Sequence, residues 1–427
     1  MIAVALPRMI DELGIDVTTA GWLATAYLIV VASLQPVGGK LGDRFGRRPF
    51  LLGGLAVLGL ASVGAALSTE IGPLIAFRCG QALAASVLFP NGSALLREAV
   101  PEHRRGSRFG MLGALISLGA AIGPPAGGVL VGLGGWPAIF WVNVPLVLVV
   151  FVVGLRAIPV PIRRATDARF DAGGAVVLAA VLGTVAWVLN RGIDRAGGPG
   201  VIVAALLGFA VFLVWELRHA DPVVQLRLFG RMPFVSACGG VALSNFSLYV
   251  VLLSVPLLLD ERGWSESGVG GVLAAMSVAM AVVAPLGGRA ADRFGRRIPA
   301  VVGLSVLASG LAALALVGAT ASGVVLVVCL FVSGLGLGLS NPSLSTSAVE
   351  SVEAHDSGMA AATYSTSRYL GSIVGTSILA GLLAPGGPGF GFVLWLVTGA
   401  ALAATALAPG LAGRPRRAPA DTDVVGS

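Results

Sequence analysis

The sequence predicts an all-helical protein that crosses a membrane about fourteen times, because its composition and length fit no soluble class. Of 427 residues, 56% are hydrophobic and 11% are charged, and the mean hydropathy is +0.91. Soluble domains contain about 45–50% apolar and about 25% charged residues. A core surrounded by water could not bury this excess, and disordered chains are poor in apolar residues. At about 20 residues per membrane helix and about 10 per connection, the chain has room for about 14 spans.

The apolar runs define the expected helices in order. Thirteen runs are long enough to span a bilayer: 20–39, 50–68, 71–96, 109–133, 138–155, 172–189, 201–217, 234–259, 269–287, 300–318, 324–346, 359–383 and 390–407. A further run, 1–10, covers only about half of the hydrocarbon core at about 1.5 Å per residue. We therefore expect thirteen complete spans and a partial first helix.

The basic residues predict the orientation. Every second connection is basic, and these connections together with the C-terminal tail hold 22 of the 28 lysines and arginines. Positive charge marks the cytoplasmic side of a membrane protein. We expect a multi-pass protein of a bacterial cytoplasmic membrane with its basic loops and C-terminus inside. This distribution accounts for the net charge of +7 without a nucleic-acid partner.

One segment of the sequence is repeated. Pro36–Arg48 recurs as Pro285–Arg297 with nine of 13 positions identical, at an offset of 249 residues. Both copies follow a span on the basic side, so the two halves have the same orientation, as in transporters built from parallel repeats. The expected organisation is an N-terminal six-helix bundle at 1–158, a two-helix insertion with its linkers at 159–232, a C-terminal six-helix bundle at 233–413 and a cytoplasmic tail at 414–427.

The repeated segment resembles a family signature. Gly39-x-Leu41-x-Asp43-Arg44-x-Gly46-Arg47-Arg48 is similar to the loop between the second and third helices of the major facilitator superfamily. The resemblance covers almost the whole chain and implies that Asp43 latches one bundle to the other in one access state. The alternative is a basic anchor for anionic headgroups without a switching role. The implied gating residues are Gly39, Asp43, Arg44, Gly46 and Arg47, with Gly288, Asp292 and Arg293 in the second half.

A glycine motif narrows the expected function. The span after Arg108 contains Gly110-x8-Gly119-x3-Gly123-Pro124-x2-Gly127-Gly128, which resembles the fifth-helix motif of drug:proton antiporters. Small residues let helices approach closely in lipid. Since 61 of the 427 residues are glycine, a role in packing alone is the alternative. Trp22, Tyr27 and the central insertion resemble the fourteen-helix branch of these antiporters, the QacA/EmrB-like multidrug exporters.

Polar residues inside the expected spans are candidates for the transport pathway. An arginine within a membrane is costly and usually faces a bundle interior or an aqueous cavity. Arg78 shares a helix face with Gln81, and the resemblance implies a role in proton movement or in holding a cavity carboxylate. A structural arginine satisfied by helix carbonyls is the alternative. Arg368 lies at mid-span, where Arg368-x-x-Gly371 resembles a pattern of the family. The weaker candidates, for which helix–helix hydrogen bonding is at least as good an explanation, are Asn91, Asn245, Tyr249 and Asn341.

No acidic residue lies deep inside a span. Proton antiport ordinarily needs a titratable carboxylate in the cavity. The resemblance implies an aspartate a few residues before the segment that matches Ala3–Pro7, a position that would precede Met1. The expectation is that the sequence begins too late and that its first helix is truncated.

These observations favour a secondary exporter of drugs or hydrophobic metabolites that uses proton antiport and needs no other cofactor. The expected partners are an amphiphilic small molecule and membrane lipid. No Walker-type loop is present, so no ATPase is required, and no catalytic or metal-binding constellation of His, Ser or Cys indicates an enzyme. The alternatives are a symporter or facilitator that imports a small polar solute, against which the Gly-Pro motif argues, and a non-transporting membrane sensor.

Overall fold

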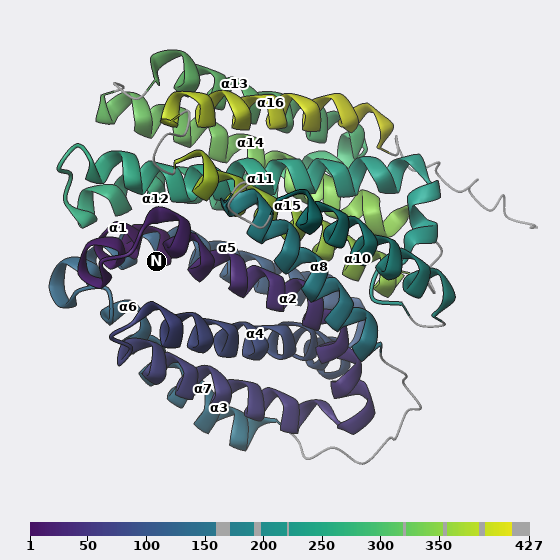
Figure 1. Ribbon diagram of the computed structural model, residues 1–427. Helices are drawn as coiled ribbons and strands as arrows, with labels where there is room; N and C mark the ends of the chain where they lie inside the picture. The colour runs from purple at the N-terminus through teal and green to yellow at the C-terminus, as the bar shows by residue number, and fades with distance from the viewer. Residues whose placement is uncertain are drawn as a thin grey trace, which may run out of the picture.

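The computed structural model describes residues 1–158, 171–191, 198–219, 222–318, 322–352, 357–383 and 389–411. Within these ranges every regular element is a helix (Figure 1). The first half comprises α1 (Ile2–Leu13), α2 (Val17–Phe45), α3 (Arg47–Ala66), α4 (Ile71–Ala99), α5 (Glu102–Gly134), α6 (Ala138–Trp141) and α7 (Asn143–Ala157). The insertion comprises α8 (Ala172–Arg191) and α10 (Pro199–Arg218). After the 3-10 turn η1 (Leu226–Gly230), the second half comprises α11 (Met232–Asp260), α12 (Glu266–Phe294), α13 (Arg297–Val317), α14 (Gly323–Glu350), α15 (Ser357–Leu382), α16 (Gly389–Leu407) and η4 (Ala408–Gly410).

The predicted all-helical membrane fold is confirmed. Counting α6 and α7 as one span, the described residues form fourteen helical segments, of which the first has only 12 residues. Ten described helices are long and apolar enough to cross a membrane. Their outward surfaces carry large apolar side chains, including Leu60 at 73% and Leu146 at 61% exposure, as expected of side chains that face lipid.

The internal repeat is visible in the helix boundaries. α2 and α12 each have 29 residues, and their first and last residues are separated by the same 249-residue offset. A side chain caps each beginning: Asp16 accepts from the Thr19 amide at 2.8 Å, and Ser265 accepts from the Gly268 amide at 3.3 Å. Each helix ends at a glycine with positive φ, Gly46 at 96° and Gly295 at 84°, a conformation that favours glycine.

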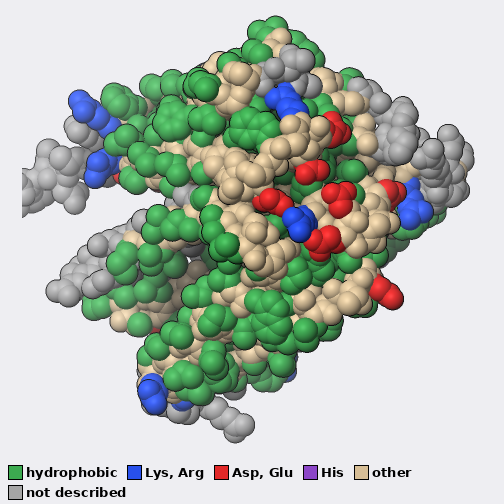
Figure 2. Space-filling model, turned by 90° about the vertical axis from the view of Figure 1, so that its left-hand side faces the viewer, with side chains coloured by type: hydrophobic (Ala, Val, Ile, Leu, Met, Phe, Trp, Pro, Cys, Tyr) green, Lys and Arg blue, Asp and Glu red, His purple; other side chains and the backbone are tan. Residues whose placement is uncertain are grey.

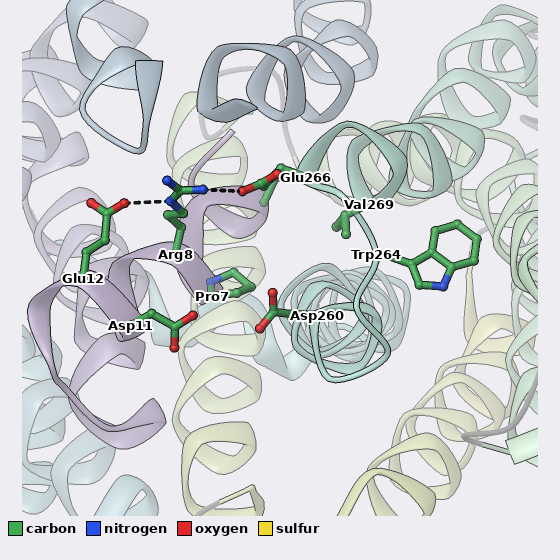
Figure 3. Close-up of a pocket in the computed structure, with 9 residues that line it drawn as sticks. Pro7, Arg8, Asp11, Glu12, Asp260, Trp264, Glu266 and Val269 are labelled. Atoms are coloured by element: carbon green, nitrogen blue, oxygen red, sulfur yellow. Dashed lines mark hydrogen bonds and ion pairs between the residues drawn. The ribbon is translucent and has the colours of Figure 1, made fainter. Parts of the chain in front are cut away.

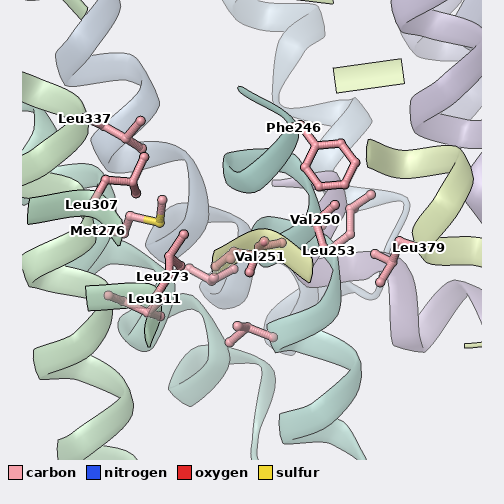
Figure 4. Packing of buried hydrophobic residues seen from close by; sticks show 14 of the residues in the cluster. Phe246, Val250, Val251, Leu253, Leu273, Met276, Leu307, Leu311, Leu337 and Leu379 are labelled. Atoms are coloured by element: carbon pink, nitrogen blue, oxygen red, sulfur yellow. The ribbon is translucent and has the colours of Figure 1, made fainter. Parts of the chain in front are cut away.

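Each half is a bundle in which the fourth helix packs against the two helices before it. In the first half α4 lies against α2 and α3, and in the second half α14 lies against α12 and α13, while α11 packs on α15 and α16. The largest apolar cluster fills the second half (Figure 4) and includes Phe246, Leu273, Leu307 and Leu337. It extends into the first half through α1, where Met9 is fully buried.

The insertion hairpin covers the seam between the halves. α8 packs against α2 of the first half and α15 of the second (Figure 1). The Trp22 and Trp187 rings lie 6.1 Å apart, and Asn190 donates to the Thr18 carbonyl at 3.1 Å. At the other end of the hairpin, the buried Asp171 accepts from the Trp215 indole at 2.9 Å and from the Gly174 amide at 2.7 Å. The hairpin is therefore fixed to both bundles.

Candidate functional site

Two surfaces of the bundle frame the site. The basic face is the end of the molecule where α2 gives way to α3 and α12 gives way to α13. The opposite face is the end where α1 gives way to α2 and α11 gives way to α12. The two faces differ in how their charged side chains are paired, and the difference bears on how the halves are joined.

On the basic face, charged side chains of the signature pair within each half. Arg47 forms ion pairs with Asp43 at 2.7 Å and with Glu98 of α4 at 2.9 Å. In the second half, Arg296 pairs with Asp292 and with Glu350 of α14, each at 2.8 Å. These hydrogen bonds raise the pKa of Arg296 above its ordinary value. Each arginine thus ties the end of its α2 or α12 helix to the fourth helix of the same half.

The remaining signature residues have simpler surroundings. Gly46 forms the positive-φ turn, and Gly39 lies against Pro90 of α4. Arg44 and Arg293 lie over the rings of their neighbours Phe45 and Phe294, at 5.3 and 5.4 Å. A Cβ at Gly288 would meet open space. A latch from Asp43 to the opposite bundle stays a prediction for another access state.

The second part of the α5 glycine motif lies at the contact between the two halves. α5 packs along α12 over much of its length. A methyl group added at Gly128 as a Cβ would overlap the Glu266 carbonyl oxygen. A methyl group added at Gly270 would lie 2.7 Å from the Pro124 carbonyl oxygen. Only glycine permits this backbone approach.

The other positions of the motif are less confined. Gly127 lies against Met1, Gly123 is 3.9 Å from the same residue and Gly119 faces open space. The side-chain surroundings of Gly110 lie outside the described residues. The motif therefore contacts the opposite half through Pro124 and Gly128.

On the opposite face, an ion pair joins the two halves. The sequence did not predict this ion pair. Acidic side chains gather there around a basic one (Figure 2). Arg8 of α1 pairs with Glu12 at 2.7 Å and with Glu266 of α12 at 2.9 Å (Figure 3). Asp11 and Asp260 lie on the same cavity of about 350 Å³. Arg8 and Glu266 are 258 residues apart and belong to no motif, so no sequence pattern connects them.

Within the membrane, Arg78 has neutral partners. Arg78 lies about 10 Å along α4 from the first residue of that helix, at about 1.5 Å per residue. Its Nη1 donates to Gln81 Oε1 at 2.7 Å and its Nε donates to the Leu23 carbonyl at 3.3 Å. Gln81 donates in turn to Ser62 Oγ at 2.8 Å, and the guanidinium carbon lies 4.4 Å from the centre of the Tyr27 ring. Arg78 and Gln81, which the sequence places on one helix face, are thus joined by a hydrogen bond.

Arg368 occupies α15 in the second half. Its Nη2 donates to the Tyr369 hydroxyl at 3.4 Å, and the guanidinium carbon lies 5.0 Å from the centre of that ring. Tyr249 of α11 packs against the same buried apolar cluster as Tyr27 of α2 and Tyr369 of α15. Close by, Thr25 of α2 and Thr376 of α15 share a buried hydrogen bond of 2.8 Å. Side chains from both halves therefore meet in this region.

A cavity of about 670 Å³ opens at Arg78, and all of its lining residues belong to the first half. It is lined by Tyr27, Arg78 and Gln81 at its polar part and by Leu88 and Phe89 among its apolar residues. Its α4 lining continues to Leu96, about 27 Å from Arg78 at about 1.5 Å per residue. The cavity therefore combines one cationic group with an extended apolar wall.

The other candidates lie elsewhere or bond locally. Trp22 packs against the insertion through Trp187. Asn245 donates to the Val241 carbonyl of its own helix at 3.0 Å, and Asn91 joins α4 to α2 by donating to the Gly38 carbonyl at 2.8 Å. Asn341 Oδ1 is buried in α14 without a hydrogen-bond partner among the described residues. Among those residues no group of three His, Cys, Asp or Glu side chains could hold a metal ion.

Known proteins of similar sequence include proteins named for drug resistance. The chain is 30% identical over 391 residues to the multidrug resistance protein Stp of Mycobacterium tuberculosis, an alignment that covers 90% of this chain and 72% of that protein. It is also 30% identical over 391 residues, with the same coverage, to the tetracenomycin C resistance and export protein of Streptomyces glaucescens. The chain and these relatives therefore align over both halves.

A solved structure shares the fold. The inward-open conformation of the xylose transporter XylE from E. coli superposes with a TM-score of 0.68 at 16% sequence identity, and the alignment covers 97% of this chain and 92% of that one. The Major Facilitator Superfamily model matches residues 1–217 and 235–425. With both halves of the chain matched and the fold shared, this multi-pass membrane protein belongs to the Major Facilitator Superfamily of transporters.

Proposed function

We propose that the protein exports drugs or hydrophobic metabolites across the bacterial cytoplasmic membrane by proton antiport. The observation that carries the proposal is the contact of the α5 motif with α12 through Pro124 and Gly128, because it ties the antiporter-like motif to the seam that must open and close. The names of the two relatives, one a multidrug resistance protein and one a resistance and export protein, support an outward direction.

The transport cycle proposed is alternating access. The basic face is the cytoplasmic side in this proposal, and the opposite face is closed by α5 against α12 and by Arg8 with Glu266. A substrate enters from the cytoplasm or the inner leaflet, the halves rock about the central cluster, and the opposite face opens. The substrate is an amphiphilic small molecule, the coupling ion is the proton, and no ATPase is needed.

Transport by purified protein in liposomes tests the proposal. The probes are tetracenomycin C and the aromatic anion 8-anilinonaphthalene-1-sulfonate, and a pH-sensitive dye reports proton movement. We expect an imposed pH gradient to drive probe movement opposite to the protons, and an uncoupler to abolish it. Movement of a probe together with protons would favour a symporter, and movement that ignores the gradient would favour a facilitator. If neither probe moves, the export proposal fails for the two classes tested.

A matched pair of variants tests the role of the motif. Gly128→Ala places a methyl against the Glu266 backbone, whereas Gly132→Ala, one turn later on α5, meets nothing within 4 Å. We expect Gly128→Ala to lose most transport and Gly132→Ala to keep it. Equal activity of the two variants would show that the motif does not act through its contact with α12.

A further inference from the structure

The membrane interior of the protein contains positive charge without matching negative charge. Each half contributes one arginine to the centre, Arg78 from α4 and Arg368 from α15. Neither forms an ion pair in the described part of the chain. The acidic residues of the sequence all lie near helix ends or in connections. Two guanidinium groups are therefore held in a low-dielectric region without a counter-charge from the described residues, an arrangement that is costly unless an anion compensates it.

The two arginines keep donor capacity for such an anion. A guanidinium has five N–H donors. Arg78 uses Nε and Nη1 in the hydrogen bonds that the described residues provide, and Arg368 uses Nη2. Both side chains are only partly buried, and Arg78 lines the 670 Å³ cavity. Their remaining N–H groups can reach a ligand, and arginine recognises carboxylates through paired hydrogen bonds.

All four tyrosines of the chain surround these arginines. The ring of Tyr27 lies beside Arg78 and that of Tyr369 beside Arg368. Tyr249 packs against the same buried apolar cluster as Tyr27 and Tyr369, and Tyr364 lies four residues before Arg368 on the same face of α15. These residues come from α2, α11 and α15, so both halves contribute. Tyrosine offers an aromatic face to a flat apolar ligand and a hydroxyl donor to an anionic one.

We propose that this arginine–tyrosine cluster binds amphiphilic organic anions, with the acidic group of the substrate at Arg78 and Arg368 and its aromatic body against the tyrosines. A cationic aromatic ligand would find the same rings, but it would be repelled by both guanidinium groups. A neutral ligand would gain the apolar contacts and leave the two charges uncompensated. The inference rests on the proposed export function only for the direction in which the bound anion is moved.

Direct binding to purified protein tests the substrate class without requiring transport. Radiolabelled naphthylacetate is the anionic probe, and naphthylethanol and naphthylethylammonium supply the same ring with neutral and positive groups. We expect the anion to bind at least about tenfold more tightly than the alcohol, the gain from one charge-assisted hydrogen bond, and the ammonium to bind most weakly. Equal affinity for anion and alcohol, tighter binding of the ammonium, or no binding of any probe at millimolar concentration would overturn the proposal.

Arginine variants locate the anion. Arg78→Gln and Arg368→Gln should each weaken naphthylacetate binding by about tenfold or more, with less than about twofold change for naphthylethanol. Arg78→Lys keeps the charge and should retain part of the selectivity if the glutamine variant is unstable. Arg191→Gln is the control, because Arg191 also lies over an aromatic ring, that of Trp187 at 4.4 Å, but on the insertion. An equal loss in this control would overturn the assignment.

The same probes in liposomes separate this inference from the proposed function. If naphthylacetate binds selectively but is not moved by a pH gradient, the export proposal fails and the substrate class stands. If naphthylethylammonium is exchanged for protons while naphthylacetate is not, export stands and the anion proposal is refuted.

Discussion

Gly270→Ala should hold the opposite face of the transporter open. An alanine Cβ at Gly270 would lie 2.7 Å from the Pro124 carbonyl oxygen and 3.2 Å from Pro125 Cα, whereas ordinary contact starts at 3.4 Å. Both neighbours are backbone atoms, so no side chain can rotate away. α12 must move from α5 by about 0.7 Å. Overpacking of this kind costs about 1–3 kcal/mol in the closed arrangement, which is a shift of about 5- to 150-fold in the equilibrium between two states.

Accessibility of a buried position on the seam measures this shift. Thr25 is fully buried between α2 and α15. In a background without Cys79, Cys238 and Cys329, Thr25→Cys should react slowly with a membrane-impermeant maleimide added from the opposite face. Adding Gly270→Ala should raise the reaction rate at least about fivefold, and transport should fall because the closed state is needed in each cycle.

The control variant lies one residue away. A Cβ at Gly271 meets nothing within 4 Å, so Gly271→Ala has the same helix propensity change without the contact. If Gly270→Ala labels and transports like Gly271→Ala, α5 and α12 do not form the closure that we describe, and the steric reasoning is refuted.

Three further predictions concern charged side chains. Glu266→Gln removes the ion pair with Arg8 that joins the halves. Because the pair is partly exposed, we expect the labelling rate of Thr25→Cys from the opposite face to rise no more than about fivefold, and a larger rise would contradict this. Asp171→Ala leaves the Trp215 indole without its acceptor and should lower the midpoint of thermal unfolding, by about 1–3 kcal/mol of stability, whereas an unchanged midpoint would refute the contribution of the buried bond. Hydrogen bonds from Thr19, first from its side chain and then from its amide, hold the pKa of Asp16 below its ordinary value. The stability from this cap is therefore present above the unfolded-state pKa of about 3.9 and is lost as the pH falls through the lower folded-state pKa; Asp16→Asn should remove that pH dependence in melts between pH 2 and 6, and an unchanged dependence would contradict it.

The helices and the repeat could be predicted because each follows from local pattern. Apolar runs of about 20 residues locate the spans. The runs end too early where a helix continues into polar residues: α12 extends to Phe294, although its apolar run ends at 287. Charged residues at a helix end lie outside the hydrocarbon core of the membrane. They therefore end the apolar run in the sequence, although the helix continues through them.

The partners across the seam could not be predicted in the same way. The motif identified Gly128 as a position of close approach, but nothing in the sequence names α12 as the helix that approaches it. Arg8 and Glu266 are 258 residues apart in the chain and follow no periodicity. The four tyrosines are scattered at 27, 249, 364 and 369, and only the packing of α2, α11 and α15 brings them to two arginines.

The repeat implies two equivalent contacts across the seam, and the chain makes them differently. The contact of α5 with α12 corresponds to that of α15 with α2, and Pro124 corresponds to Thr376 at the 252-residue offset between these helices. In the described residues, the first contact is a fit of backbone to backbone without a hydrogen bond between α5 and α12. The second contains the Thr25–Thr376 hydrogen bond, which is worth about 0.5–1.5 kcal/mol.

Closure of the opposite face therefore depends on weak interactions. Opening breaks that one hydrogen bond, the partly exposed Arg8–Glu266 pair of about 0–1 kcal/mol, and the close packing along α5. The polar terms together amount to no more than a few kcal/mol, which is within the differential binding energy that a ligand can supply between two states. An anion that compensates Arg78 and Arg368, one from each half, would bind best in the state that brings these arginines closest. The charge of the substrate would then contribute directly to the choice between the two access states.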